Sequence, residues 1–443
     1  MKIGTQNTRN KTECRGKKAF FSGLPFNSAY SAFHNIYRAA ILIVLFVSQG
    51  WAKDIYVSQG GSIGDAVISS GPGDKVIIKK GSYKESGIII DKPIEVTGED
   101  YPEIDGMGKG EIFTVRSDNV TIKGIKLINC GYSSMKDFAA LKIENASGCR
   151  IEQNKLLNNF FGIYLAGSKK CEIISNEIIS NAVSEISSGN GIHLWKCDSI
   201  LVSGNIITGH RDGIYFEFVT HSKVLNNRSE KNIRYGLHFM FSNYDDYENN
   251  VFKNNGAGVA VMYTRYVKMI NNRFEDNWGP NAYGLLLKDI SDALIQHNMF
   301  HKNTTGLYSE GGTRINILNN TFSENGWASK ILGNCTDDTV KLNNFIGNTF
   351  DVSTNSSRNT NLFSENYWDK YNGYDLNKDG AGDVPFRPVS MFSMVVEETP
   401  ASLFLLRSFI VELLDVAEKV VPVFIPESLI DERPRMSELR GTK

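Results

Sequence analysis

The sequence predicts an all-β fold, a right-handed parallel β-helix (solenoid) followed by a C-terminal helical tail. The main observation is a glycine followed by alternating apolar residues, which recurs at intervals of 22 to 29 residues. A period near 22 with alternating apolar residues is typical of short strands, and one such unit buries its apolar face only by stacking on its neighbours. The glycine motif begins at Gly162, Gly191, Gly213, Gly236, Gly258, Gly284 and Gly306.

A recurring asparagine is the second observation. It suits a fixed corner of a solenoid, because Asn tolerates left-handed backbone geometry and its amide can bond to the next coil. Parallel strands joined by crossovers are nearly always right-handed. A β-propeller would need blades about twice as long as this repeat. The asparagines are Asn154, Asn176, Asn205, Asn227, Asn250, Asn272, Asn298, Asn320 and Asn344.

The chain divides into three predicted parts. Residues 1–52 predict a signal peptide, with basic residues before the apolar run 39–47 and small residues at Gly50 and Ala52. Residues 53–390 predict the solenoid, and residues 391–443 predict a helical tail for docking or capping. Export through a signal peptide predicts a periplasmic protein.

Charge and cysteine content exclude some functions. Without residues 1–52 the chain has 41 Lys and Arg (48 minus 7) and 48 Asp and Glu (49 minus 1), a net charge of −7. This balance argues against nucleic acid as a partner. The five cysteines that remain are odd in number and widely spaced, so they do not predict a disulfide framework.

The strand after each glycine predicts an outward stripe of side chains. Its first and third residues are apolar and face the interior, so the second and fourth face outward. This stripe includes His193, His238, Met240 and Met262. Thioether and imidazole ligands together suit Cu(I), which predicts a transient copper site. The alternative is that these side chains only cover the sheet beneath a loop.

Two insertions accompany this stripe, at residues 182–189 and 277–282, each just ahead of a glycine strand. Loops on a rigid scaffold often carry function.

A carbohydrate-binding or polysaccharide-cleaving β-helix is the alternative function. Glycoside hydrolysis needs two carboxyl groups about 5–9.5 Å apart. The stripe offers Glu217 and Glu310, which lie four coils apart, roughly 19 Å at the usual strand spacing. The sequence therefore predicts that the protein is not an enzyme.

An Asp/Gly loop near the end of the solenoid resembles a calcium-binding loop. Its oxygen ligands would be Asp375, Asn377, Asp379 and Asp383, but Phe386 stands where an EF-hand loop has its bidentate glutamate. A calcium site and a purely structural turn both remain open.

The C-terminal tail predicts an apolar helix with Thr399 as N-cap and Pro400 at its first position. It either caps the last coil or docks on a partner or membrane surface. The predicted docking residues are Leu403, Phe404, Leu406, Phe409, Ile410 and Leu413.

An ordered set of motifs resembles the NosD family, the periplasmic maturation proteins of nitrous oxide reductase. The resemblance spans most of the chain after residue 52 and is dense from residue 189 onward. The motifs are GNGIHLWKCD (189–198), GHRDGIYFEFVT (209–220), RYGLHFMFSNYDDYENN (234–250), GAGVAVMYTR (256–265), NWGPNAYGLLLKDISD (277–292), GNTFDVSTN (347–355), NYWDKYNGYDLNKDGAGDVPFRPVS (366–390) and LIDERP (429–434).

The resemblance implies a solute-handling component that is not an enzyme. It implies work with an ABC transporter, made of the ATPase NosF and the membrane subunit NosY, in assembling the copper–sulfide cluster of nitrous oxide reductase. The lipoprotein chaperone NosL is the implied copper donor. Docking of the apolar tail on NosY would associate the protein with the membrane.

Overall fold

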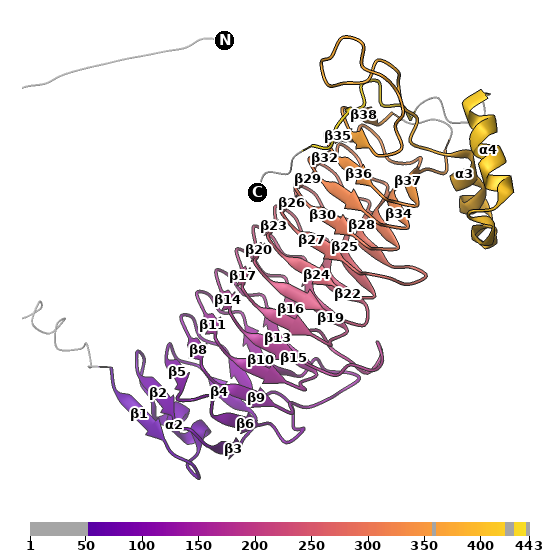
Figure 1. Cartoon of the computed structure of the whole chain (residues 1–443). Helices are drawn as coiled ribbons and strands as arrows, with labels where there is room; N and C mark the ends of the chain where they lie inside the picture. Colours follow the sequence, from indigo (N-terminus) through magenta and orange to yellow (C-terminus); the bar gives the residue numbers. More distant parts are fainter. Residues whose placement is uncertain (1–51, 357–359, 421–428, 440–443) are drawn as a thin grey trace, which may run out of the picture. The chain divides into compact units, whose positions relative to one another are not determined.

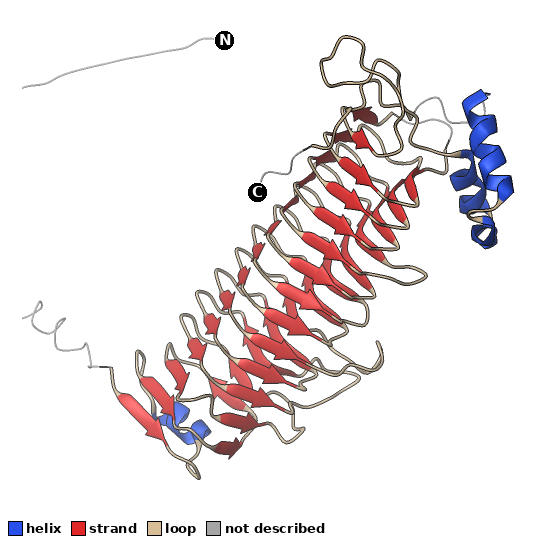
Figure 2. Cartoon of the chain, viewed as in Figure 1, coloured by secondary structure: helices blue, strands red, loops and turns tan. Residues whose placement is uncertain are grey.

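The computed structural model describes residues 52–356, 360–420 and 429–439, which form a right-handed parallel β-helix with helices at its C-terminal end (Figures 1 and 2). The predicted fold class is confirmed. A typical coil contributes one strand to each of three parallel sheets. The predicted signal peptide lies outside the described residues except for Ala52.

The three sheets differ in strand length, and the third holds the longest strands. The first sheet comprises β1 (Asp54–Val57), β2 (Lys75–Ile78), β5 (Glu95–Gly98), β8 (Thr121–Lys123), β11 (Arg150–Glu152), β14 (Glu172–Ile174), β17 (Leu201–Ser203), β20 (Lys223–Leu225), β23 (Asp246–Glu248), β26 (Lys268–Ile270), β29 (Leu294–Gln296), β32 (Asn316–Leu318), β35 (Thr339–Lys341) and β38 (Leu362–Ser364). The second comprises β3 (Ser82–Lys84), β6 (Glu103–Asp105), β9 (Lys126–Ile128), β12 (Lys155–Leu157), β15 (Glu177–Ile179), β18 (Ile206–Thr208), β21 (Arg228–Glu230), β24 (Val251–Lys253), β27 (Arg273–Glu275), β30 (Met299–His301), β33 (Thr321–Ser323), β36 (Asn344–Ile346) and β39 (Tyr367–Trp368). The third comprises β4 (Ile88–Ile90), β7 (Phe113–Val115), β10 (Ala139–Glu144), β13 (Phe161–Ala166), β16 (Ile192–Trp195), β19 (Asp212–Glu217), β22 (Tyr235–Met240), β25 (Ala257–Met262), β28 (Tyr283–Lys288), β31 (Thr305–Glu310), β34 (Trp327–Ile331) and β37 (Phe350–Ser353).

The interior is filled by side chains that stack from coil to coil. Leu237 and Phe239 of β22 are fully buried, as the alternation predicts. Continued alternation would place Phe241 in the core as well, but it is 39% exposed because it lies at the corner after β22 with φ of 50°. One interior column consists of stacked rings from the second sheet, Phe252, Phe274, Phe300, Phe322, Phe345 and Trp368.

The predicted asparagine corner is a buried hydrogen-bonded ladder. Each side-chain oxygen accepts from the backbone N–H, and in most steps also from the amide, of the preceding ladder residue, as between Asn227 and Asn250. Asn344 was expected to continue it, but Asn343 does, and Asn344 instead bonds to the backbone of Leu439. A second ladder, which the sequence analysis missed, comprises Asn232, Asn255, Asn277, Asn303, Asn325 and Asn348.

Both ends of the described solenoid are covered. Near the start, α2 (Ile63–Ser69) buries Ile63 and Val67 and contacts β1, β2 and β4. At the other end, the segment after residue 428 returns to the last coil, where the buried carboxylate of Asp431 accepts the last bonds of the first ladder, from the backbone N–H and amide of Asn366.

The C-terminal tail contains α3 (Met391–Glu398), the 3₁₀ helix η1 (Pro400–Leu405) and α4 (Phe409–Val420). Thr399 was expected to cap one continuous helix, but its side chain makes no capping bond and η1 ends before α4 begins. Instead Ser390 caps α3, accepting from the N–H of Ser393. No helix in the described part of the chain is long and apolar enough to cross a membrane.

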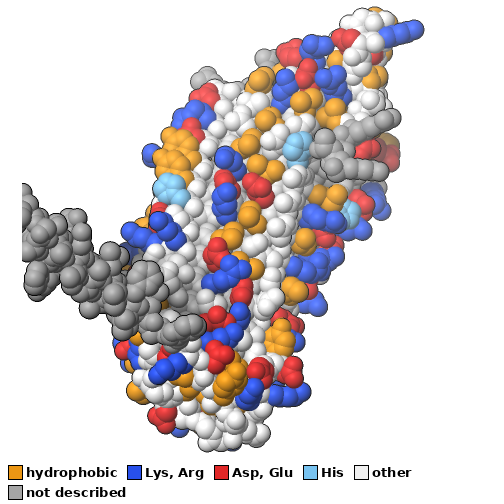
Figure 3. Space-filling model, turned by 90° about the vertical axis from the view of Figure 1, so that its left-hand side faces the viewer, with side chains coloured by type: hydrophobic (Ala, Val, Ile, Leu, Met, Phe, Trp, Pro, Cys, Tyr) orange, Lys and Arg blue, Asp and Glu red, His pale blue; other side chains and the backbone are white. Residues whose placement is uncertain are grey.

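The outer surface carries rows of side chains, because the coils place equivalent residues above one another (Figure 3). The predicted insertions form loops directly before β16 and β28, and a further loop, residues 129–138, precedes β10. All three lie at the same edge of the third sheet, so they border its outer face.

Candidate functional site

The outer face of the third sheet carries a row of stacked rings. Tyr164, His193, Tyr215 and His238 are register partners on β13, β16, β19 and β22. The His193 ring lies 4.5 Å from the Tyr164 ring and 4.7 Å from the Tyr215 ring, and His238 meets Tyr215 edge-on at 5.0 Å. The predicted outward stripe is therefore a continuous aromatic row with its two histidines on either side of Tyr215.

Two methionines lie in the neighbouring row. Met240 ends β22 and Met262 ends β25, and the two residues are register partners. Both are half-buried, and the Met240 sulfur lies 3.6 Å from the Tyr215 hydroxyl. Neighbouring strands are about 4.8 Å apart, so one soft cation can contact both thioethers.

His238 is buried, and one of its ring nitrogens lacks a hydrogen-bond partner. Its Nδ1 lies 3.8 Å from a carboxylate oxygen of Asp212 and 3.5 Å from a guanidinium nitrogen of Arg234. Its Nε2 is buried and unbonded. A buried polar atom without a partner is unfavourable, and a metal ligand is one role that explains it.

Asp212 is fully buried beneath this histidine. Burial raises its pKa, but hydrogen bonds from His238 and Arg234 outweigh this and hold the pKa below its usual value. The carboxylate is therefore ionised and pairs with Arg234, whose Nε donates at 2.9 Å. A carboxylate behind a ligating imidazole fixes ring orientation in many metal sites.

His193 has a different environment. Its Nδ1 lies 3.0 Å from the amide nitrogen of Asn190, while the Asn190 oxygen accepts from Arg211, which can only donate. The Asn190 amide therefore donates to Nδ1, and the His193 proton sits on Nε2. Burial, with help from the Arg211 charge, lowers the pKa of His193 to about 3, so the ring is neutral.

Met240 and Met262 are neighbours across two strands, and His238 lies two residues before Met240 on β22, whereas His193 lies two strands away, beyond Tyr215. Tyr215 lies between the two histidines. The Nδ1 of His193 already accepts a hydrogen bond from the Asn190 amide, so the proton of His193 is on Nε2. Among the described residues, no three His, Cys, Asp or Glu side chains cluster in a way that could hold a metal ion. Besides these ligand types, this face supplies the thioether sulfurs of Met240 and Met262.

Exposed aromatic columns next to the methionines were missed by the sequence analysis. They occupy corner positions with positive φ on three consecutive coils, although Asn or Gly is favoured there. Neighbouring rings stack at 4.9–5.2 Å. The sequence did contain a signal for them, because in each column the residues follow the last residue of β19, β22 and β25 by the same number of positions. The columns are Phe218, Phe241 and Tyr263, and His221, Tyr244 and Tyr266.

The two outward glutamates of the stripe do not form a catalytic pair. Glu217 and Glu310 are separated by three intervening strands, β22, β25 and β28. Glu310 instead pairs with Lys288 at 3.5 Å.

The Asp/Gly loop is held by its own side chains. Asp375 accepts from the N–H groups of Asp379 and Gly380, and Asp383 accepts from the N–H of Leu376. Asp379 forms an ion pair with Arg433 at 3.0 Å. These bonds account for the shape of the loop.

The tail presents an exposed apolar surface, here called the tail surface. All six predicted docking residues belong to it, and Phe404 and Phe409 are 81% and 75% exposed. The opposite side, with Leu405, Val411 and Leu414, packs on Trp327, Phe350, Phe392 and Val396. The tail therefore covers the last coils and also leaves an apolar face free. The tail surface comprises Leu403, Phe404, Leu406, Phe409, Ile410 and Leu413.

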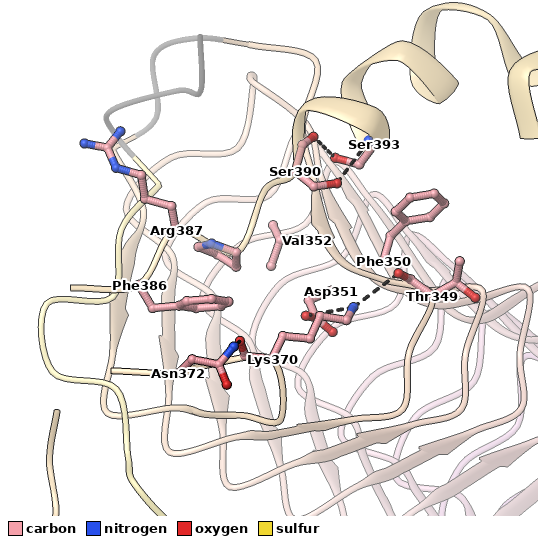
Figure 4. A pocket seen from close by; sticks show the side chains of 11 residues that line it. Thr349, Phe350, Asp351, Val352, Lys370, Asn372, Phe386, Arg387, Ser390 and Ser393 are labelled. Atoms are coloured by element: carbon pink, nitrogen blue, oxygen red, sulfur yellow. Dashed lines mark hydrogen bonds and ion pairs between the residues drawn. The ribbon is translucent and has the colours of Figure 1, made fainter. Parts of the chain in front are cut away.

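A cavity of about 350 Å³ lies where α3 joins the last coils (Figure 4). Buried Asp351 pairs with exposed Lys370 at 3.1 Å, and Lys370 also donates to the carbonyl groups of Asn348 and Thr349. Burial raises the pKa of Asp351 to about 6. Ser390 and Ser393 also bond to each other, whereas one oxygen of Asp351 and one nitrogen of Arg387 are buried without a partner.

Comparison with known proteins gives a consistent family. Residues 176–377 match the family model described as "Periplasmic copper-binding protein (NosD)". The chain is 30% identical over 367 residues to the "Probable ABC transporter binding protein NosD" of Pseudomonas aeruginosa, covering 79% of this chain and 85% of that protein. The protein of the same description from Stutzerimonas stutzeri is 28% identical, with 78% and 83% covered.

Solved structures resemble the fold alone. The A-module of an Azotobacter vinelandii mannuronan C-5 epimerase superposes with a TM-score of 0.50 at 15% identity, covering 68% of this chain and 86% of that one. The Dettilon tailspike protein gives a TM-score of 0.52 at 12% identity, with 69% of each chain covered.

Proposed function

Because this chain belongs to the NosD family of periplasmic copper-binding proteins, we propose that it is a non-enzymatic accessory protein in nitrous oxide reductase maturation. In this role it delivers copper to the reductase or assists assembly of its copper–sulfide cluster. Its proposed partners are an ABC transporter of the NosF and NosY type and the copper chaperone NosL. The relatives' description as ABC transporter binding proteins supports the transporter partnership.

The observation that carries the copper proposal is the pair of in-register thioethers on the sheet face that also carries His238, whose Nε2 has no hydrogen-bond partner. Met240, Met262 and the Nε2 of His238 supply soft and intermediate ligands, a set that favours Cu(I) over hard cations. Asp212 would orient the imidazole from behind and offset the charge of Arg234. Two thioethers and one imidazole bind Cu(I) without the thiolates of a permanent site, which suits release to a partner.

A Cu(I) titration tests this site. Replacing both Met240 and Met262 with leucine keeps the side-chain volume but removes the soft donors. We expect the Cu(I) affinity, measured in competition with a chromophoric chelator, to fall by at least about ten-fold, equivalent to about 1.4 kcal/mol.

Met299→Leu is the matched control, because Met299 is exposed on the second sheet and remote from this pair. It should leave the affinity unchanged. Equal Cu(I) affinity in the double variant and the parent protein would contradict the site.

We propose that the tail surface docks on the membrane subunit of the transporter. Its exposed phenylalanine and leucine side chains lie on helices whose other side is fixed to the last coils, so the surface is presented rigidly. Exposed contiguous apolar patches are typical of interaction sites.

Replacing Phe404 and Phe409 with serine should reduce copurification with a detergent-solubilised NosF–NosY transporter by at least about ten-fold, since buried aromatic anchors dominate such interfaces. Leu376→Ser removes an equally exposed apolar side chain, 77% exposed, from the Asp/Gly loop. Full copurification of the double variant, or equal loss in the control, would argue against this surface.

For Asp375, Asn377, Asp379 and Asp383 we propose a structural role, with calcium as the competing hypothesis. The internal hydrogen bonds of the loop and the Arg433 ion pair support the structural role.

A further inference from the structure

A cleft of about 340 Å³ opens at the N-terminal half of the aromatic row. Its floor includes Phe161, His193 and Tyr215, and its walls come from the loops that precede β10 and β16. A volume in this range is typical of small-molecule sites. The copper ligands proposed above do not line it.

Hydrogen-bond donors gather on one side of this cleft. His193 keeps its proton on Nε2, because Nδ1 accepts from Asn190. Arg211 uses its Nε to hold Asn190 in that orientation, at 3.2 Å. Asn190 therefore orients both the neutral His193 ring, which carries its N–H at Nε2, and the guanidinium of Arg211.

Arg211 shares the carboxylate of Asp212 with Arg234. Its Nε is 3.9 Å from Asp212, but that carboxylate is fully buried and bonded to Arg234 through two nitrogens. The outer nitrogens of Arg211 therefore remain available for an anion. A planar guanidinium fork recognises a carboxylate through two parallel bonds.

The remaining lining residues suit hydroxyl groups and a ring. Asp137, Ser133 and Ser134 come from the loop before β10, and Ser188 comes from the loop before β16. A carboxylate such as Asp137 and serine hydroxyls bind sugar hydroxyls. Aromatic side chains provide an apolar surface for a ring.

We propose that this cleft binds a small sugar acid, a hydroxylated ring that carries one carboxylate. Arg211 and the His193 N–H hold the carboxylate, while Asp137 and the serines hold hydroxyl groups. His193 then belongs to this binding site and not to the copper ligands, from which Tyr215 separates it. The proposal does not rest on the copper function, but the two sites adjoin, because Arg234 lines the cleft and also contacts His238.

Calorimetric titration of the full mature chain with glucuronate and galacturonate tests the proposal, with glucose and acetate as partial ligands. We expect at least one uronate to bind about ten-fold or more tightly than either partial ligand, because only the uronate combines charge-assisted hydrogen bonds to its carboxylate with hydrogen bonds to its hydroxyl groups. Arg211→Gln should weaken uronate binding by about ten-fold or more, and Arg211→Lys should weaken it less, because it keeps the charge but loses the fork.

Arg228→Gln is the control, because Arg228 lies on the second sheet and pairs with Glu230. It should bind uronate like the parent chain. Arg211→Gln should also keep the parent thermal unfolding curve and Cu(I) affinity, which separates this site from the copper site. Absence of binding of both uronates, or equal binding by Arg211→Gln, would overturn the proposal. Tighter binding of a glutamate-rich hexapeptide than of either uronate would also overturn it, in favour of a protein segment.

Discussion

Replacing Asp431 with alanine is expected to lower the free energy of unfolding by roughly 3–5 kcal/mol. The fully buried carboxylate accepts from the N–H groups of Glu365 and Asn366, the Asn366 amide and the Trp368 indole. Alanine leaves these buried donors without an acceptor. Because the donors belong to the last coil, fraying should begin there and expose its amides to hydrogen exchange.

Denaturant unfolding followed by tryptophan fluorescence measures this loss, and hydrogen exchange over residues 362–368 locates it. Glu432→Ala is the matched control, since Glu432 is the exposed neighbour in the same motif. Asp431→Asn should lie between the two, because it keeps one acceptor oxygen but presents an amide to donors. Unchanged stability of Asp431→Ala would show that the return of the tail does not close the solenoid.

The repeat was sufficient to predict the solenoid, because one period sets the fold of every coil. The interior positions followed from the alternation, as at Leu237 and Phe239. The alternation stops at corners, and Phe241 shows the consequence. It follows Met240 in the sequence pattern of a strand, but the backbone turns there and the ring lies at the surface.

The sequence predicted the asparagine ladder, but it was harder to predict which of two adjacent asparagines belongs to it. Asn343 and Asn344 are adjacent, and a shift of one residue reverses which side chain faces inward. The Asn-x-Phe pattern of the neighbouring coils, as at Asn320 and Phe322, fits Asn343 with Phe345 and so distinguishes the two residues. The closing residue, Asp431, is 65 residues beyond the Asn366 that it bonds, a separation that periodicity cannot bridge.

For the candidate site, the strand pattern predicted which side chains face outward but not what lies behind them. Arg234 reaches His238 from the preceding corner, and Asp212 reaches it from the neighbouring coil. The tautomer of His193 depends on Asn190, which belongs to the insertion loop. Such contacts depend on loop and side-chain geometry, so residue spacing does not reveal them.

For the C-terminal tail, the exposed surface was easier to predict than the local structure. Its apolar composition predicted an exposed surface, and the predicted docking residues are all partly or largely exposed. Its helix boundaries were wrong, because Pro400 begins a short 3₁₀ helix and the chain turns again before Phe409.

The pH dependence of stability should be dominated near neutrality by one buried acid. Burial raises the pKa of Asp245 to about 8. One of its oxygens accepts from the Ser222 N–H at 2.7 Å, and the other has no partner. Between its ordinary pKa of 3.8 and about 8 the folded chain keeps a proton that the unfolded chain has released, so stability falls as pH rises through this window.

Asp245→Asn should remove this fall, because asparagine stays neutral and keeps the acceptor for Ser222. Burial sets the pKa values of Asp338 and Asp351 at about 6 and lowers that of His193 to about 3, so these groups affect stability mainly at lower pH. Between pH 6.5 and 8 the parent chain should therefore lose roughly 1–2 kcal/mol more stability than the variant. Denaturant midpoints at both pH values measure the difference. Asp276→Asn, at a half-buried ion pair with Lys253, should keep the parent slope. Equal slopes in Asp245→Asn and the parent chain would mean that the folded protein holds Asp245 ionised, with a donor or water at its second oxygen.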